Sequence, residues 1–99
     1  MKFAAVIEYT SDSAKTEQHR PAHRAYLTGL LNKGQLVAAG PFTDASGALI
    51  VYEADSPGAA EALIAADPFR AAGVFVRWTV RPWKMVFANP ALMPAAPPS

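Results

Sequence analysis

The sequence predicts an α+β domain in which strands and helices follow one another as βαββαβ, the split βαβ or ferredoxin-like order. Three observations support this prediction. Apolar residues alternate in some segments and recur at helical spacing in others, prolines mark the expected helix starts, and 99 residues suffice for one domain only. We therefore expect a four-stranded antiparallel sheet with two helices on one of its faces.

The chain begins with a strand and a helix. Apolar side chains alternate from Phe3 to Tyr9, which is typical of a half-buried strand. A polar stretch at Lys15–Arg20 is predicted to hold a helical turn, and Pro21 is expected in the first turn of the helix proper, where its missing N–H costs nothing. Gly34 is predicted to end this helix in a left-handed conformation. The residues at helical spacing form its apolar face: His23, Tyr26, Leu27, Leu30 and Leu31.

Two short strands and a second helix come next. Leu36–Ala39 is a short apolar run that ends at a Gly-Pro pair, and Ala48–Tyr52 is a second apolar run that contains β-branched residues. Both are predicted strands. Ser56 and Pro57 form a cap and a first-turn proline, which predict a helix through Ala65.

The last part of the chain contains a helical turn, a strand and a tail. Asp67 precedes a proline and is predicted to cap a short turn of helix. Val74–Val80 is the predicted fourth strand, which we expect to resume at Trp83–Phe87. Residues 88–99 hold four of the nine prolines and are predicted to be an irregular arm or tail. We therefore place one domain at residues 1–87 and a proline-rich tail at residues 88–99.

The composition excludes several classes of function. The chain has no cysteine, which excludes disulfides, thiolate metal sites and cysteine nucleophiles. A net charge of +1 without a cluster of basic residues argues against nucleic-acid binding, and the scattered glycines form no phosphate loop. No apolar stretch approaches the ~18–20 residues of a membrane span, and the N-terminus lacks a signal-peptide core. We expect a cytoplasmic protein that binds no membrane.

The chain holds more apolar residues than two helices can cover. Hydrophobic residues make up 52% of the sequence, and three predicted strand segments are apolar on both faces, at residues 36–39, 48–52 and 74–76. Strands of this kind are covered on both sides. Two helices cover one face, so we expect a second copy of the chain to cover the other in a homodimer that forms through the sheet face.

Among the few ionisable groups, His23 and Asp67 are the best candidates for chemistry. His23 lies on the apolar face of the first helix, and histidine exchanges protons near neutral pH. If Asp67 approaches the His23 ring, its carboxylate would orient the imidazole as a histidine–carboxylate dyad requires. Two other interpretations stay open: His23 could be a core histidine bonded to a carbonyl, and Asp67 could be only a helix cap.

Other candidates concern binding. Arg20 lies three residues before His23, where its guanidinium could bind a carboxylate or phenolate ligand or could simply be a solvated charge. His19 and His23 stand four residues apart, but no carboxylate stands at a recognised ligand spacing beside them, so no metal site is expected. An apolar pocket could be lined by aromatic residues that are otherwise plain core: Tyr9, Phe42, Phe69, Trp78 and Trp83.

Four segments, taken in order, have a specific likeness to a known family. They are Arg20–Leu27, Gly34–Pro41, Ala66–Val74 and Val80–Lys84. They contain an Arg-x-x-His helix, an Ala-Gly-Pro strand end and an Asp-Pro-Phe turn, and in this combination they resemble the YciI-like (YCII-related) family from about residue 2 to Phe87. The resemblance implies a ferredoxin-like fold that dimerises as a dimeric α/β barrel. It also implies a pocket with a paired histidine and aspartate, here His23 and Asp67.

The resemblance extends to function, because a related protein is a dehydrochlorinase of a chlorinated hydroxyquinol. We therefore predict a small enzyme without cofactor or metal, lyase-like, that acts on a small organic molecule, for instance an aromatic one. His23 would act as general base or acid, Asp67 would hold the imidazole, and Arg20 would bind an anionic group of the substrate. Tyr9 and Phe69 would line the substrate site. The alternative is a ligand-binding or accessory domain without turnover.

Overall fold

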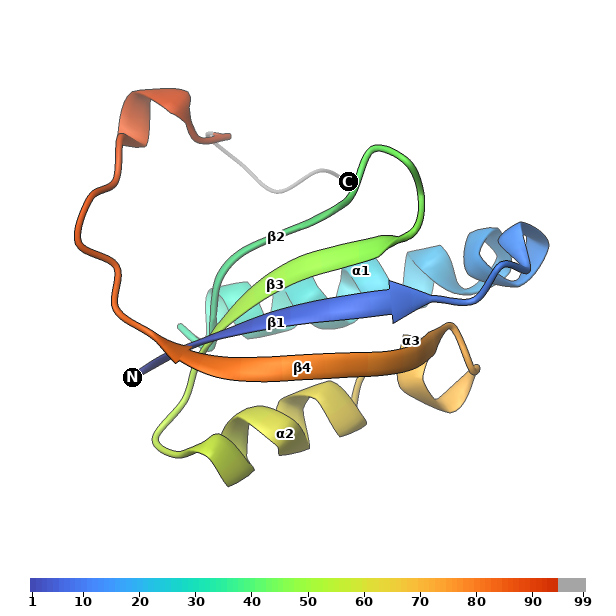
Figure 1. Cartoon of the computed structure of the whole chain (residues 1–99), viewed down its shortest axis with the longest axis horizontal. Coiled ribbons are helices and arrows are strands. Elements are labelled where there is room, and N and C mark those ends of the chain that lie inside the picture. The colour runs from blue at the N-terminus through green and yellow to red at the C-terminus, as the bar shows by residue number, and fades with distance from the viewer. Residues whose placement is uncertain (95–99) are drawn as a thin grey trace.

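The computed structural model describes residues 1–94 of the chain. Four strands form one antiparallel sheet in the order β2-β3-β1-β4, and the helices pack on one face of it (Figure 1). The α+β, ferredoxin-like arrangement is therefore confirmed, with α3 as the expected short turn of helix. The elements are β1 (Lys2–Tyr9), α1 (Ser13–Asn32), β2 (Leu36–Pro41), β3 (Gly47–Glu53), α2 (Pro57–Ala65), α3 (Pro68–Ala71), β4 (Phe75–Trp83) and the 3₁₀ turn η1 (Pro90–Leu92).

The core lies between the sheet and the helices. Alternate side chains of β1 and of its neighbour β3 point to the helical face, as the period of two in the sequence requires. They are buried and stand opposite one another in register: Phe3, Ala5 and Ile7 on β1, and Tyr52, Ile50 and Ala48 on β3. The two long helices are also joined by a hydrogen bond, in which Tyr26 Oη donates to the Leu63 carbonyl at 2.6 Å.

Helix α1 begins earlier than predicted. The prediction that Pro21 stands in the first turn is wrong, because Asp12 caps the helix and Pro21 lies in its interior. Asp12 Oδ1 accepts a hydrogen bond from the Lys15 N–H at 3.1 Å, and Thr16 is buried. This cap and this packing offset the helical hydrogen bond that an interior proline removes. The end of the helix agrees with the prediction, since Gly34 follows it with φ +74°.

Strand β4 is continuous, and it ends before the predicted second part is complete. It runs through Pro82 to Trp83, so the expected interruption at Pro82 is wrong. Proline is tolerated there because β4 is an edge strand that pairs only with β1. The predicted strand at Trp83–Phe87 is also wrong from Lys84 onward. The predicted tail at residues 88–99 contains η1, and its part beyond Pro94 lies outside the described residues.

The face of the sheet away from the helices is not covered by any helix of the described chain. Val6 on β1 stands opposite Leu49 on β3 on this face, and both side chains are exposed. We call this face the outer face. Among residues 1–94, no helix combines the length and the apolar character that crossing a membrane requires.

Candidate active site

The structure brings His23 and Asp67 together. The Nδ1 atom of His23 lies 2.8 Å from Oδ1 and 2.9 Å from Oδ2 of Asp67. Both side chains are buried, with 7% of His23 and 0% of Asp67 exposed. An ionised carboxylate can only accept hydrogen bonds, so Nδ1 carries the proton and its N–H donates a hydrogen bond to Asp67. In the neutral imidazole, Nε2 is then left with a free lone pair.

Two local structures position this pair. His23 lies on the apolar face of α1, which the sheet below it buries. Asp67 is the N-cap of α3, and its Oδ1 also accepts the Phe69 N–H at 2.9 Å. The carboxylate is therefore fixed by its own helix before it meets the imidazole. Asp67 is therefore a helix cap, as the sequence predicts, and it also contacts His23, so it is not only a cap.

Aromatic rings hold the imidazole in place. The Phe69 ring stacks on His23 with centroids 3.9 Å apart and planes at 9°. Phe75 meets the same imidazole edge-on at 6.0 Å, and Tyr9 meets Phe69 edge-on at 5.5 Å. Rotation of the imidazole about its own axis would break the stacking and the contact with Asp67 together. The ring is thus held in one orientation.

His23 forms part of the wall of a cavity of about 360 Å³ between α1 and the edge strand β2. This volume is at the lower end of the range for small-molecule sites, ~300–1,000 Å³. The α1 wall carries the polar groups, and the β2 wall is built from small or apolar residues. The lining consists of Tyr9, Arg20, His23, Arg24, Leu27, Thr28, Leu31, residues 36–41, Ala48, Ile50, Phe69, Met93 and Pro94.

The charged groups that line the cavity are cationic. Arg20 and Arg24 both line it, whereas none of its lining residues is a carboxylate. Arg20 Nη2 is held by Glu17 at 2.6 Å, and its buried Nε has no partner among the described residues. Burial raises the pKa of the Tyr9 hydroxyl to about 12, and Asp67 adds to the rise, whereas the two arginines act against it. Tyr9 therefore stays a neutral phenol even at pH values where an exposed tyrosine begins to ionise.

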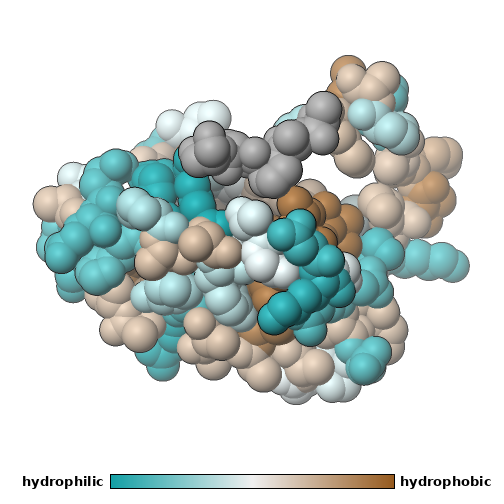
Figure 2. Space-filling view, turned by 180° about the vertical axis from the view of Figure 1, so that it is seen from behind, coloured by the Kyte–Doolittle hydropathy of each residue, from teal (hydrophilic) through white to brown (hydrophobic). Residues whose placement is uncertain are grey.

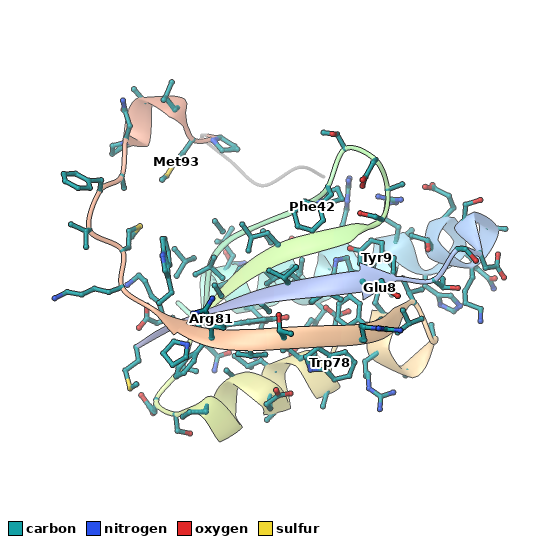
Figure 3. The ribbon with its side chains drawn as sticks, viewed as in Figure 1. Glu8, Tyr9, Phe42, Trp78, Arg81 and Met93 are labelled. Carbon is teal, nitrogen blue, oxygen red and sulfur yellow. The ribbon has the colours of Figure 1, made fainter. Side chains whose placement is uncertain are left out.

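Four predicted site residues, Tyr9, Arg20, His23 and Phe69, line the cavity, and Asp67 lies behind His23. The other aromatic candidates are not among the lining residues. Trp78 instead packs beside α2, where its Nε1 donates to Glu61 at 3.1 Å (Figure 3). The remaining two, Phe42 and Trp83, are exposed.

The sequence interpretation missed Arg24, the β2 wall and Met93. Arg24 could have been found, because it stands four residues after Arg20 and therefore on the same side of α1. Nothing in the sequence near Met93 indicated that the chain returns to the cavity after β4. As for metals, no group of three or more histidine, aspartate or glutamate side chains gathers in the described part of the chain.

Comparison with known proteins gives a consistent result. The model of the YCII-related domain matches residues 1–84. Protein YciI of Escherichia coli and that of Shigella flexneri are each 36% identical over 95 residues, which cover 82% of this chain and 97% of each relative. An uncharacterised protein of Bacillus subtilis, YjpA, is 36% identical over 69 residues, which cover 70% of this chain and 80% of the relative.

A solved structure is similar as well. It is the 5-chloro-2-hydroxyhydroquinone dehydrochlorinase of Burkholderia phenoliruptrix in complex with 2,5-dihydroxybenzoquinone. The TM-score is 0.74 at 29% sequence identity, and the match covers 85% of this chain and 94% of the other.

Proposed function

Because this chain belongs to the YCII-related family, we propose that it is a small cofactor-independent enzyme that performs acid–base chemistry on a small organic molecule. The observation that carries the proposal is the buried His23–Asp67 pair at the wall of a cavity. The similar solved structure, a dehydrochlorinase, makes an elimination of the lyase class the favoured reaction.

In this proposal Asp67 fixes the tautomer of His23, and His23 takes a proton from the substrate. With Nδ1–H bonded to Asp67, Nε2 is the nitrogen that takes a proton from the substrate. In the keto tautomer of a chlorinated hydroxyquinol, the carbon that bears chlorine has gained the hydrogen of the neighbouring hydroxyl and is tetrahedral. When Nε2 takes the proton of the hydroxyl para to the new carbonyl, the O–H electron pair forms a second carbonyl and the ring double bond moves to the chlorine-bearing carbon. The C–Cl bond breaks, and its electron pair leaves with chloride. Asp67 stabilises the imidazolium that results. The proton then passes to water, and no oxidant or reductant is needed.

The substrate would be held by the α1 side of the cavity. Arg20 would bind an anionic oxygen, for which a guanidinium is well suited. Tyr9 would donate a hydrogen bond to the same part of the substrate, since its raised pKa keeps the hydroxyl protonated. Phe69 would contact the substrate ring beside His23. Proton transfer of this kind contributes about 10²–10⁴-fold to a rate.

The first test is chloride release from 5-chloro-2-hydroxyhydroquinone, together with calorimetric binding of 2,5-dihydroxybenzoquinone. We expect the wild-type chain to release chloride and to bind the quinone. The variant His23→Gln should keep the fold and the binding but lose about 10²–10⁴-fold in rate. Asp67→Asn is the matched variant, because asparagine caps a helix as well as aspartate does but cannot stabilise the imidazolium. It should lower the rate with little loss of stability.

The alternative function, ligand binding without turnover, is favoured by one observation: only 7% of His23 is exposed, which limits the access of a substrate to its ring. The same measurements separate the two functions. Saturable binding of the quinone without chloride release would show that the protein is a ligand-binding domain and not an enzyme for this substrate. Equal rates for the wild type and His23→Gln would reject the role of His23. If neither binding nor release occurs, the proposed substrate class is wrong.

The proposal includes a homodimer. The exposed apolar side chains of the outer face support it, because a second copy placed back to back would remove them from water. The dimer through this face, like the cytoplasmic location expected from the sequence, stays a prediction.

A further inference from the structure

Beyond β4 the chain continues as an arm, residues 84–94, that exposes its apolar side chains. Phe87 is 92% exposed, Leu92 is 83% exposed and Val86 is 69% exposed. Figure 2 shows the arm standing away from the body of the protein, with hydrophobic residues on it. Single exposed apolar residues are ordinary, but such a run in one segment indicates a binding surface.

The arm has local structure of its own. Asn89 Oδ1 accepts the Ala91 N–H at 3.1 Å, and the Met93 N–H bonds the Pro90 carbonyl at 3.2 Å, so that η1 is capped at both ends. Proline at the first position of the turn fixes its backbone. A segment ordered in this way loses less conformational freedom on binding than a flexible tail does.

The position of the arm connects the outer face with the cavity. It follows Trp83, the last residue of the edge strand β4. Met93, near the far end of the arm, lines the cavity beside β2, which is the opposite edge of the sheet. Figure 3 shows the Met93 side chain pointing from η1 toward the body. The arm thus passes from one edge of the sheet toward the other.

The size of the surface favours a protein partner that uses the outer face and the arm together. The strands hold 8, 6, 7 and 9 residues, of which every second side chain faces outward, so the outer face alone offers about fifteen residues. A stable interface uses roughly 20–30 residues on each side. Residues 84–94 supply the difference.

The charges favour a second copy of this chain as that partner. At one end of the outer face Lys2 is paired with Glu53 at 2.9 Å, and at the other Arg77 lies 3.7 Å from Glu8. The centre between these pairs is apolar at Val6. With a net charge of +1, two copies repel each other little. Arg81, opposite Ala4 on the same face, adds an exposed cation, so the face offers a strongly charged partner only a weak field.

We propose that the arm, residues 84–94, clasps a second copy of this chain that is seated on the outer face, with Phe87 and Leu92 as the contacts. The inference rests on the proposed homodimer and adds which segment holds it together. Because Met93 lines the cavity of its own chain, the clasp also fixes one wall of the candidate active site.

The absence of cysteine allows a direct test. An unlabelled Phe87→Cys chain carrying a nitroxide is refolded together with an equal amount of ¹⁵N-labelled wild-type chain, and the amide signals of Val6 and Leu49 are followed. The matched control carries the nitroxide at Ala25→Cys, an exposed position on α1. In parallel, sedimentation measures the dimer dissociation constant of the double variant Phe87→Ser, Leu92→Ser.

The inference predicts broadening of the outer-face amides by the label at position 87 and none by the label at position 25. It also predicts that the double variant raises the dissociation constant about tenfold or more, a change of about 1.4 kcal/mol. A further sample carries the nitroxide at position 87 and the ¹⁵N label in the same chain. If the outer-face amides of a dimer broaden in this sample and not in the mixed one, the arm lies on its own chain, which would overturn the clasp but not the dimer. A single-chain mass at every concentration would reject the dimer and the clasp together.

Discussion

Asp67 accepts hydrogen bonds from two parts of the chain, the first turn of α3 and the imidazole of His23 on α1. A carboxylate has two oxygens with about four lone-pair positions, so that capping α3 leaves enough capacity to accept Nδ1 of His23. The Asp-Pro-Phe turn predicts the cap by itself. The partnership depends on where α1 lies, which no local pattern contains.

For Arg20 and Tyr9, the sequence likewise predicts one property of the residues and leaves another undetermined. Their residue types and positions indicated a binding site, and both line the cavity. The raised pKa of Tyr9 follows from burial and from the Asp67 charge, and these exist only after the chain has folded. Electrostatic properties of this kind are therefore the part of the site that the sequence cannot predict.

The raised pKa of Tyr9 has a consequence for stability at high pH. Its pKa is about 12 in the folded chain against 10.0 for an ordinary tyrosine, so the folded state binds more protons than the unfolded state between these values. The contribution is complete below pH 10 and is lost as the pH rises toward 12. The free energy of unfolding, measured with urea from pH 9 to pH 12, should fall less steeply for Tyr9→Phe than for the wild type. Parallel curves would contradict the assignment.

At the scale of elements, the first three strands and the second helix were predictable, whereas the start of α1 and the end of β4 were not. Period-two alternation and the Ser-Pro cap are local signals, and they located β1 and α2 closely. Pro21 is a strong local signal too, but the Asp12 cap and the burial of Thr16 outweigh it. Local preference fails where packing between distant elements supplies the larger free energy.

Strand β3 depends on a glycine at its first residue. A Cβ atom added at Gly47 would lie 1.8 Å from the Ile7 carbonyl oxygen, a backbone atom that cannot turn away. We expect Gly47→Ala to lower the free energy of unfolding by about 1–3 kcal/mol, as overpacking does. Gly40→Ala on β2 is the matched control, because nothing lies within 4 Å of its added Cβ. Chemical denaturation measures both, and equal stabilities of the two variants would contradict the crowding at Gly47.

At the scale of the whole molecule, the sequence predicted a sheet with more apolar surface than two helices can cover, and the structure leaves the outer face exposed. The arm was not foreseen as a surface, because its prolines indicated only irregular chain. Its direction is set by the end of β4, which in turn is set by pairing with β1. Assembly is thus the level at which sequence patterns say least.

The homodimer makes a separate prediction for the outer face. Val6→Asp places a charge at the centre of that face in both copies, and like charges in an interface are costly. We expect the dimer dissociation constant to rise about tenfold or more, measured by sedimentation over a range of concentrations. Ala25→Asp, on the exposed side of α1, should leave the mass unchanged. A Val6→Asp chain that dimerises as tightly as the wild type would place the interface elsewhere.

The His23–Asp67 contact joins residues 44 positions apart, so the site exists only while the chain is folded. The lifetime of the folded protein therefore depends on whether a ligand is bound at the site. Neither half of the site exists in a chain that has lost the docking of α1 on α3, so a molecule seated on His23 binds only the intact fold. Its binding free energy then adds to the free energy of unfolding. Chains with a bound ligand would unfold and be degraded less often than chains without one. The amount of the protein would then follow the amount of its ligand.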